Sequence, residues 1–227
     1  MNELKNKTIN ATKWSILEKV SIYGIRFIVG IILARLLLPR DYGVTALITV
    51  FLAIADVFVS SGFGSSLIRA KNPTNVDFST VFYYNLIISI ICWFILYKCR
   101  FAIANFFHES RLISIIPVLS LNIIINAFGQ MQRIQLMIQL NFKSQTLASL
   151  ISVLIAGTIS IFMAYRGYGV WALVFQSIIL NLINTILIWY YRKWIPKFVF
   201  SFASLSKLFS FGSKMFVSGI IGVIFNN

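Results

Sequence analysis

Two cations and one anion lie inside a stretch of the sequence that is otherwise apolar enough to enter a membrane. Lys19 and Arg26 are seven residues apart, so on a helix they differ by only about 20° and share one face. Glu18 lies about 100° from that face. Arg or Lys at the centre of a membrane helix costs about 2.5–3.5 kcal/mol, and such residues normally face the bundle interior or a wet cavity. Arg26, the deepest of the three, is therefore the strongest candidate to contact a ligand.

A purely structural explanation stays open for each of these charges. Lys19 and Glu18 lie near one end of the stretch, where long side chains can reach the membrane surface. A salt bridge that only ties helices together would also explain Arg26. The next apolar stretch has one deep anion, Asp56, and its face also contains Thr45, Thr49 and Ser60.

Uncharged polar residues form stripes along the later apolar stretches. Asn122, Asn126 and Gln130 recur every four positions and share one helical face, which Arg133 extends. A single Asn or Ser more often forms an interhelical hydrogen bond than a ligand contact. Aligned polar faces on several spans nevertheless predict a shared hydrophilic cleft. A second such face begins at Gln176 and continues with Asn181, Asn184 and Thr185.

The sequence lacks the groups that catalysis or metal binding would need. Its six acidic residues include no D-x-D motif, and its one histidine, His108, lies in a connecting segment. Cys92 and Cys99 do not have the spacing of metal ligands. The stretch GFGSS at 62–66 lacks the lysine of a phosphate-binding P-loop. We therefore predict no enzyme activity, no metal site and no cofactor, and a cleft without reactive groups favours transport.

The composition indicates that the elements holding these residues are membrane helices. Of the 227 residues, 59% are hydrophobic and 11% are charged, against about 45–50% and about 25% in soluble domains. The net charge is +14, but the cations are scattered between apolar runs rather than gathered on one basic face. This pattern favours membrane lipid over nucleic acid as a partner.

Six apolar stretches are long enough to cross a bilayer, which takes about 20 residues. They predict an all-α fold, a polytopic transmembrane helix bundle with an incomplete seventh span. Pro117, inside the fourth stretch, predicts a kink there. The predicted spans are Trp14–Leu38, Val44–Phe63, Thr80–Tyr97, Leu112–Met131, Leu147–Tyr165 and Val170–Tyr191.

The charges and the last residues predict how the chain is organised. Lys19 and Arg26 lie within the first predicted span. Of the other eighteen Lys and Arg, twelve lie on the same side of the predicted spans as the N-terminus and six on the opposite side, which predicts a cytoplasmic N-terminus. We divide the chain into a six-helix lobe (1–191), a cytoplasmic amphipathic linker (192–214) and the start of a truncated seventh span (215–227). Those last thirteen residues make about 20 Å of helix, short of a hydrocarbon core of about 30 Å. The sequence thus predicts a truncated form, one lobe of something longer.

Four stretches follow one another in a recognisable order: WSILEKVSIYGIRFIVGIILARLLLPRDYG, GFGSSLIRAKNPTNVDFSTVFYYN, GYGVWALVFQ and LFSFGSKMFVSG. Together they resemble the Wzx-type polysaccharide repeat-unit flippases of the multidrug/oligosaccharidyl-lipid/polysaccharide exporter superfamily, in the lipopolysaccharide and colanic-acid-exporter-like subgroup. The resemblance covers the whole chain, which would correspond to the N-terminal half of a family member.

The resemblance implies two six-helix lobes around a central cationic cavity. It implies transport of an undecaprenyl-diphosphate-linked oligosaccharide across the bacterial inner membrane for surface polysaccharide biosynthesis. Lys19 and Arg26 would then line the path of the diphosphate, with Asp56 or Glu18 holding them in its absence. The implied partners are membrane lipid, the lipid-linked oligosaccharide diphosphate, and a second lobe or a polysaccharide polymerase complex. The substrate path would also include Asn122, Asn126, Gln130 and Gln176.

Other functions stay open beside this one. A multidrug or cation antiporter of the same superfamily would be expected to have an acidic cavity, and the deep cations argue against it. A membrane-embedded polymerase or glycosyltransferase of the same pathway would need a large outer loop or a D-x-D domain, and the sequence has neither. A non-catalytic membrane subunit of a polysaccharide synthesis complex is the remaining alternative.

Overall fold

The computed structural model describes residues 20–60, 62–70 and 72–208, and in these ranges the regular elements are all helices. This confirms the predicted all-α fold class. The helices are 20–36, α2 (Pro39–Ser60), α3 (Phe63–Arg69), α4 (Asn75–Phe106), α5 (Leu112–Leu119), α6 (Leu121–Ile138), α7 (Phe142–Tyr165), α8 (Val170–Arg192) and 202–208.

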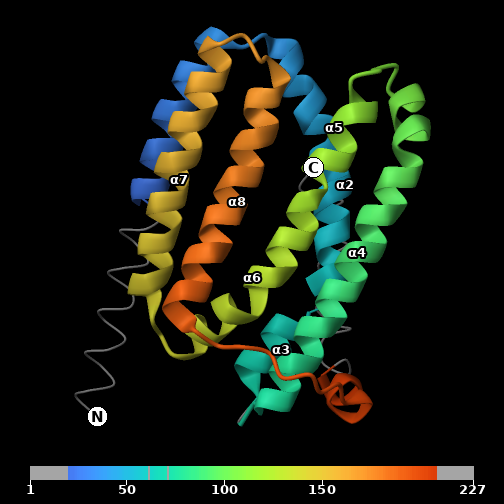
Figure 1. Cartoon of the computed structure of the whole chain (residues 1–227), viewed down its shortest axis with the longest axis vertical. Helices are drawn as coiled ribbons and strands as arrows, with labels where there is room; N and C mark the ends of the chain where they lie inside the picture. Colours follow the sequence, from blue (N-terminus) through green and yellow to red (C-terminus); the bar gives the residue numbers. More distant parts are fainter. Residues whose placement is uncertain (1–19, 61, 71, 209–227) are drawn as a thin grey trace.

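Five segments of the described chain are long and apolar enough to cross a membrane. They are α2, α4, the α5–α6 pair, α7 and α8. The first predicted span, Trp14–Leu38, begins outside the described residues, and its described part forms helix 20–36. Figure 1 shows the helices running alternately up and down, with α3 and segment 193–201 at one end of the bundle. The connectors 37–38, 107–111 and 166–169 lie at the other end.

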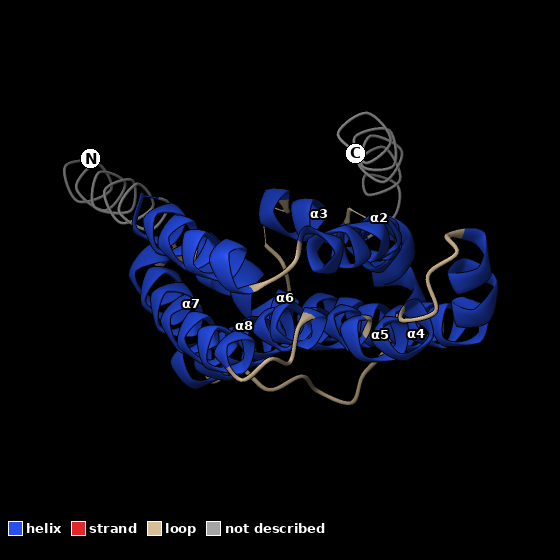
Figure 2. Cartoon of the chain, turned by 90° about the horizontal axis from the view of Figure 1, so that it is seen from above, coloured by secondary structure: helices blue, strands red, loops and turns tan. Residues whose placement is uncertain are grey.

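The helices form a row with two further helices on one face of it. Figure 2 shows α7, α8, α6 and α4 side by side, with helix 20–36 and α2 on the same face of this row. Helix 20–36 packs on the α7–α8 part through buried Val29 and Leu33, and Leu37, just after the helix, joins the same cluster. A buried apolar cluster joins α2, α4, α5, α6 and α8.

Small residues on α7 allow helix 20–36 to come close. Ser152, Ala156 and Ser160 are buried. At Gly157 the approach is closest, because a Cβ added there would lie 2.8 Å from Cγ2 of Val29. Such contacts between small residues are the usual way in which membrane helices pack.

We expect Gly157→Ala to destabilise the protein although alanine is the better helix former. The new methyl group would force the Val29 side chain to shift, and overpacking of this kind costs about 1–3 kcal/mol. The matched control is Gly30→Ala on helix 20–36, where the added Cβ meets nothing within 4 Å. Unfolding of the purified chain by SDS in mixed micelles, followed by circular dichroism, measures both. Equal free energies of unfolding for the two variants would contradict the packing argument.

Four of the predicted spans differ from the helices in the structure by five or more residues at an end. α2 begins at Pro39, α6 runs to Ile138 and α7 begins at Phe142. α4 extends beyond Thr80–Tyr97 at both ends. Its start is fixed by a capping box, in which Thr74 N donates to Asp77 Oδ2 at 2.9 Å and the Thr74 hydroxyl accepts from Asp77 N. Its 32 residues make about 48 Å of helix, so it exceeds the thickness of a bilayer core. The helix that contains Pro117 is interrupted three residues later, at Ser120 between α5 and α6, close to where the kink is predicted.

The segment after α8 is tied across the start of α4. The backbone N–H of Lys197 donates to the Ser79 hydroxyl at 3.0 Å, and that of Ser201 donates to the Thr80 hydroxyl at 3.1 Å. The Trp194 indole donates to the Asn75 side chain at 3.3 Å. Residues 209–227 lie outside the described part of the chain, and the division at 191 and 214 stays a prediction.

A cluster of charges joins the connectors at the end opposite α3. The buried Asp41 accepts from Arg111 Nη1 at 2.9 Å, and Arg111 Nε donates to Glu109 at 3.0 Å. Arg40 also donates to Glu109, at 2.9 Å. Hydrogen bonds from Arg111 and Arg40 lower the pKa of Glu109 to about 2, so this carboxylate stays charged in moderate acid. The cluster ties the start of α2 to the start of α5.

Candidate functional site

Five adjoining cavities form one groove, with polar side chains along it, between helix 20–36, α2, α3, α6, α7 and α8. Neighbouring cavities share lining residues, and Asn181 and Arg133 each line three of them. Two of the five differ clearly in the chemistry of their linings. The cationic cavity, of about 330 Å³, is lined by Arg26, Arg133, Gln145, Ser149 and Asn184 among others. The amide cavity, also of about 330 Å³, is lined by polar residues that include Thr45, Thr49, Asp56, Asn122, Asn126, Ser177 and Asn181.

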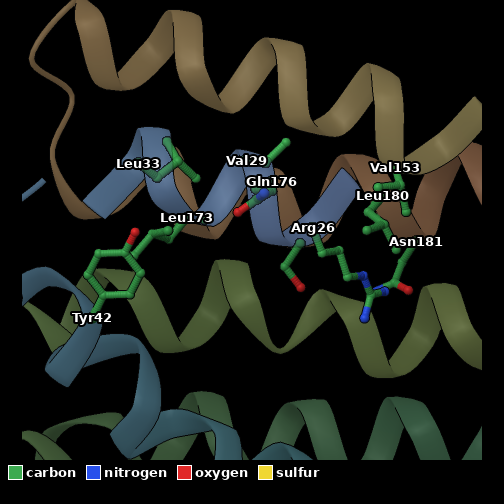
Figure 3. Close-up of a pocket in the computed structure, with 11 residues that line it drawn as sticks. Arg26, Val29, Leu33, Tyr42, Val153, Leu173, Gln176, Leu180 and Asn181 are labelled. Carbon is green, nitrogen blue, oxygen red and sulfur yellow. The ribbon is translucent and has the colours of Figure 1, made fainter. Parts of the chain in front are cut away.

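Arg26 faces the groove from helix 20–36. Figure 3 shows its side chain extending toward Asn181 of α8. It lines both the cationic cavity and a neighbouring cavity of about 430 Å³ that reaches Tyr42. No ion pair that includes Arg26 is found among the described residues, so within this part of the chain no salt bridge explains its position.

Arg133 is the second cation of the cationic cavity, and it is held by its neighbours. Its Nη2 donates to Asn184 Oδ1 at 2.8 Å. Asn184 Nδ2 in turn donates to the Ser149 hydroxyl at 3.4 Å, and Gln145 donates to the Arg133 carbonyl at 3.3 Å. The guanidinium is therefore held directly by Asn184 of α8, which Ser149 of α7 contacts in turn. Arg133 extends the predicted polar stripe but lies beyond the predicted span, which ends at Met131, whereas α6 runs to Ile138.

The amides of α6 and α8 form a hydrogen-bonded chain across the groove. Asn181 Nδ2 donates to Asn122 Oδ1 at 2.9 Å, and Asn122 Nδ2 donates to the Ser177 hydroxyl at 3.0 Å. Asn126 and Gln176 also line the groove, and within the described residues no hydrogen bond of their side chains is found. Ser177 and Asn181 line the same groove but are not among the residues of the predicted substrate path, although Asn181 lies on the predicted polar face of α8.

Asp56 lies in the groove on α2, where it lines the amide cavity and the adjoining cavity that contains Arg133. No ion pair joins it to Arg26 in the described part of the chain. The same adjoining cavity contains Gln130, whose Oε1 accepts from Asn85 Nδ2 at 2.7 Å. This bond links α6 to α4 and occupies one of the two lone pairs of the amide oxygen.

The structure thus brings most of the predicted site residues to one place. Six of the eight lie along the groove, whereas Glu18 and Lys19 fall outside the described residues. Contact of these side chains with a substrate stays a prediction. The six residues are Arg26, Asp56, Asn122, Asn126, Gln130 and Gln176.

Apolar helices around a polar groove define this chain as a multi-pass membrane protein. More particularly, it belongs to a family described as polysaccharide biosynthesis protein. The sequence model of that family matches residues 32–227, well over half of the chain. This confirms the predicted membership of the polysaccharide exporters.

Curated relatives have names that agree with this family. The chain is 26% identical to the succinoglycan biosynthesis transport protein ExoT of Rhizobium meliloti (strain 1021), over 88% of the chain and 41% of the relative. It is 24% identical to the teichuronic acid biosynthesis protein TuaB of Bacillus subtilis (strain 168), over 97% and 46%. It is 26% identical to the lipopolysaccharide biosynthesis protein WzxC of Escherichia coli (strain K12), over 99% and 46%. The chain spans less than half the length of these relatives, and no solved structure matches it.

Proposed function

We propose that this chain takes part in moving an undecaprenyl-diphosphate-linked oligosaccharide across the bacterial inner membrane for surface polysaccharide biosynthesis. The observation that supports this most is the presence of Arg26 and Arg133 in one cavity of the groove. A diphosphate that leaves water needs compensating charge, and guanidinium groups offer paired hydrogen bonds to phosphate oxygens. The names of the relatives describe transport or biosynthesis, which agrees with transport without catalysis.

Binding of farnesyl diphosphate, a short lipid diphosphate, to the purified chain in lipid nanodiscs tests this proposal. We expect saturable binding that weakens when salt is raised, because the contact is between charged groups. Farnesol, which has the same hydrocarbon and no phosphate, is the matched control ligand. Equal binding of the two ligands would refute a diphosphate site in the groove.

A cation antiporter is less well supported by the charges of the groove. Its cavities contain two guanidinium groups, from Arg26 and Arg133, against the one carboxylate of Asp56. A positive groove repels organic cations and attracts anions. We further propose that a second lobe, in the same or another chain, covers the groove, because the relatives are about twice as long.

The proposed orientation places the N-terminus and segment 193–201 in the cytoplasm. We expect cysteines at Lys7 and Lys197 to be protected from an impermeant maleimide in intact cells, because the cation asymmetry favours that side. A cysteine at Ser110, in the connector at the opposite end, should be labelled. The native Cys92 and Cys99 are first replaced by alanine. Labelling of position 7 or 197 together with protection of position 110 would show that the chain has the opposite orientation in the membrane.

A further inference from the structure

We infer that the groove has two chemically distinct parts and that the sugars of the substrate contact an amide surface beside the cationic cavity. This amide surface consists of Asn122 and Asn126 on α6 and of Gln176, Ser177 and Asn181 on α8. The inference rests on the proposed function, because it assigns a binding surface to the sugars that are attached to the diphosphate. It makes these side chains specificity determinants for the first sugars.

The order of residues along α6 and α8 separates the two parts. Asn122 and Arg133 are eleven residues apart on α6, or about 16 Å along the helix. Both helices run from the end with the connectors toward the end with α3 (Figure 1), so their amides precede Arg133 and Asn184 in the same direction. The amide cavity has no Lys or Arg in its lining, whereas the cationic cavity has two arginines. Asn181 lines both cavities, so a sugar attached to a diphosphate at the arginines is within reach of the amides.

The amide surface has hydrogen-bonding capacity that the protein leaves unused. A side-chain amide offers two N–H donors and two acceptor lone pairs, and Asn122 uses one of each within the described chain. Asn126 and Gln176 have no side-chain hydrogen bond there, and the buried Tyr42 hydroxyl, on the wall of the cavity that contains Gln176, also lacks a partner. Buried polar atoms are normally satisfied by water or a ligand. Sugar hydroxyls donate and accept, so they match this mixture of groups.

The one charge of the amide cavity narrows the class of sugar. Asp56 is the only charged residue in its lining. Its carboxylate accepts hydrogen bonds from neutral sugar hydroxyls but repels a second carboxylate, and like charges brought together cost several kcal/mol. A neutral sugar next to the diphosphate therefore fits the amide cavity better than a uronic acid does.

Three probes separate the sugar contact from the diphosphate contact in the purified chain in nanodiscs. They are farnesyl diphosphate, its glucosyl ester and its glucuronosyl ester, and dissociation constants are measured by microscale thermophoresis. We expect the glucosyl probe to bind about tenfold more tightly than farnesyl diphosphate, as one or two added hydrogen bonds would give. We expect the glucuronosyl probe to bind no more tightly than farnesyl diphosphate. In the Asp56→Asn variant, the glucuronosyl probe should bind as tightly as the glucosyl probe.

The variants Asn126→Leu and Gln176→Leu test the surface itself. Each should weaken binding of the glucosyl probe at least about fivefold more than binding of farnesyl diphosphate, because an amide that reaches the sugar has been replaced by an apolar group. Gln139→Leu, at the exposed C-terminal end of α6, is the matched control and should change the binding of neither the glucosyl probe nor farnesyl diphosphate. Circular dichroism verifies the helical content of each variant.

Two outcomes would overturn the inference, and they differ in what they say about the proposed function. If farnesyl diphosphate binds but the glucosyl probe binds no more tightly, or if its higher affinity survives both Leu variants, the amide surface does not contact the sugar. The diphosphate site then stands. If no probe binds, the proposed function fails and the inference fails with it.

Discussion

Arg26→Ala, introduced into the chromosomal gene of the producing bacterium, is expected to abolish export of the surface polysaccharide while the protein level stays near normal. The lost guanidinium would leave the diphosphate with Arg133 alone in the cationic cavity. Removing one partner of a desolvated, hydrogen-bonded charge pair costs about 2–5 kcal/mol, which is a loss of about thirtyfold or more in affinity. Capsule staining measures export, and immunoblotting of membranes measures the protein.

Two companion variants make the Arg26 result specific. Arg26→Lys should retain part of the export, since a point charge still attracts a diphosphate but loses the paired hydrogen bonds. Arg35→Ala is the matched control, because Arg35 is on the same helix, about 180° away, and lies outside the lining of the groove cavities. Normal export by Arg26→Ala would refute the cationic path. Loss of the protein from the membrane would instead show that Arg26 is structural.

Asp41→Ala is expected to be the most destabilising single change at the end of the bundle opposite α3. Asp41 is only 5% exposed and accepts from Arg111 at 2.9 Å and from the backbone N–H of Leu38 at 3.3 Å. Breaking a buried pair by removing one partner costs about 3–5 kcal/mol. Because the Arg111 side chain is 33% exposed, solvent screening weakens the pair. We therefore expect the free energy of unfolding to fall by about 2–3 kcal/mol. SDS unfolding of the purified chain measures the loss.

Arg40→Ala provides the comparison within the same cluster. Its ion pair with Glu109 has a similar length, 2.9 Å, but the Arg40 side chain is 71% exposed. Exposed pairs contribute about 0–1 kcal/mol, so this variant should unfold almost like the wild type. Equal destabilisation by both variants would show that burial of Asp41 is not what makes its pair important.

The sequence by itself determined the class of fold and most of the polar residues that line the groove. Apolar runs bounded by Pro39, by Pro73 and by charged connectors fixed where spans lie, because a bilayer core accepts only long stretches whose backbone bonds internally. Pro117 removes a backbone donor inside α5 and lies three residues before the break that precedes α6. The i, i+4 spacing of Asn122, Asn126 and Gln130 placed them on one face before any partner helix was known. These are local properties, and local sequence suffices for them.

Only the tertiary structure decided which of these faces meet. Arg26 and Arg133 are more than one hundred positions apart, and neither helix alone indicates that both line one cavity. The pairing of Arg111 with Asp41 and the chain of amides from Asn181 to Ser177 likewise join separate helices. Helical periodicity tells which side of a helix is polar but leaves open which neighbour that side faces. That choice is made by packing, through close approaches such as Gly157 on Val29, where the absence of one side chain admits another helix.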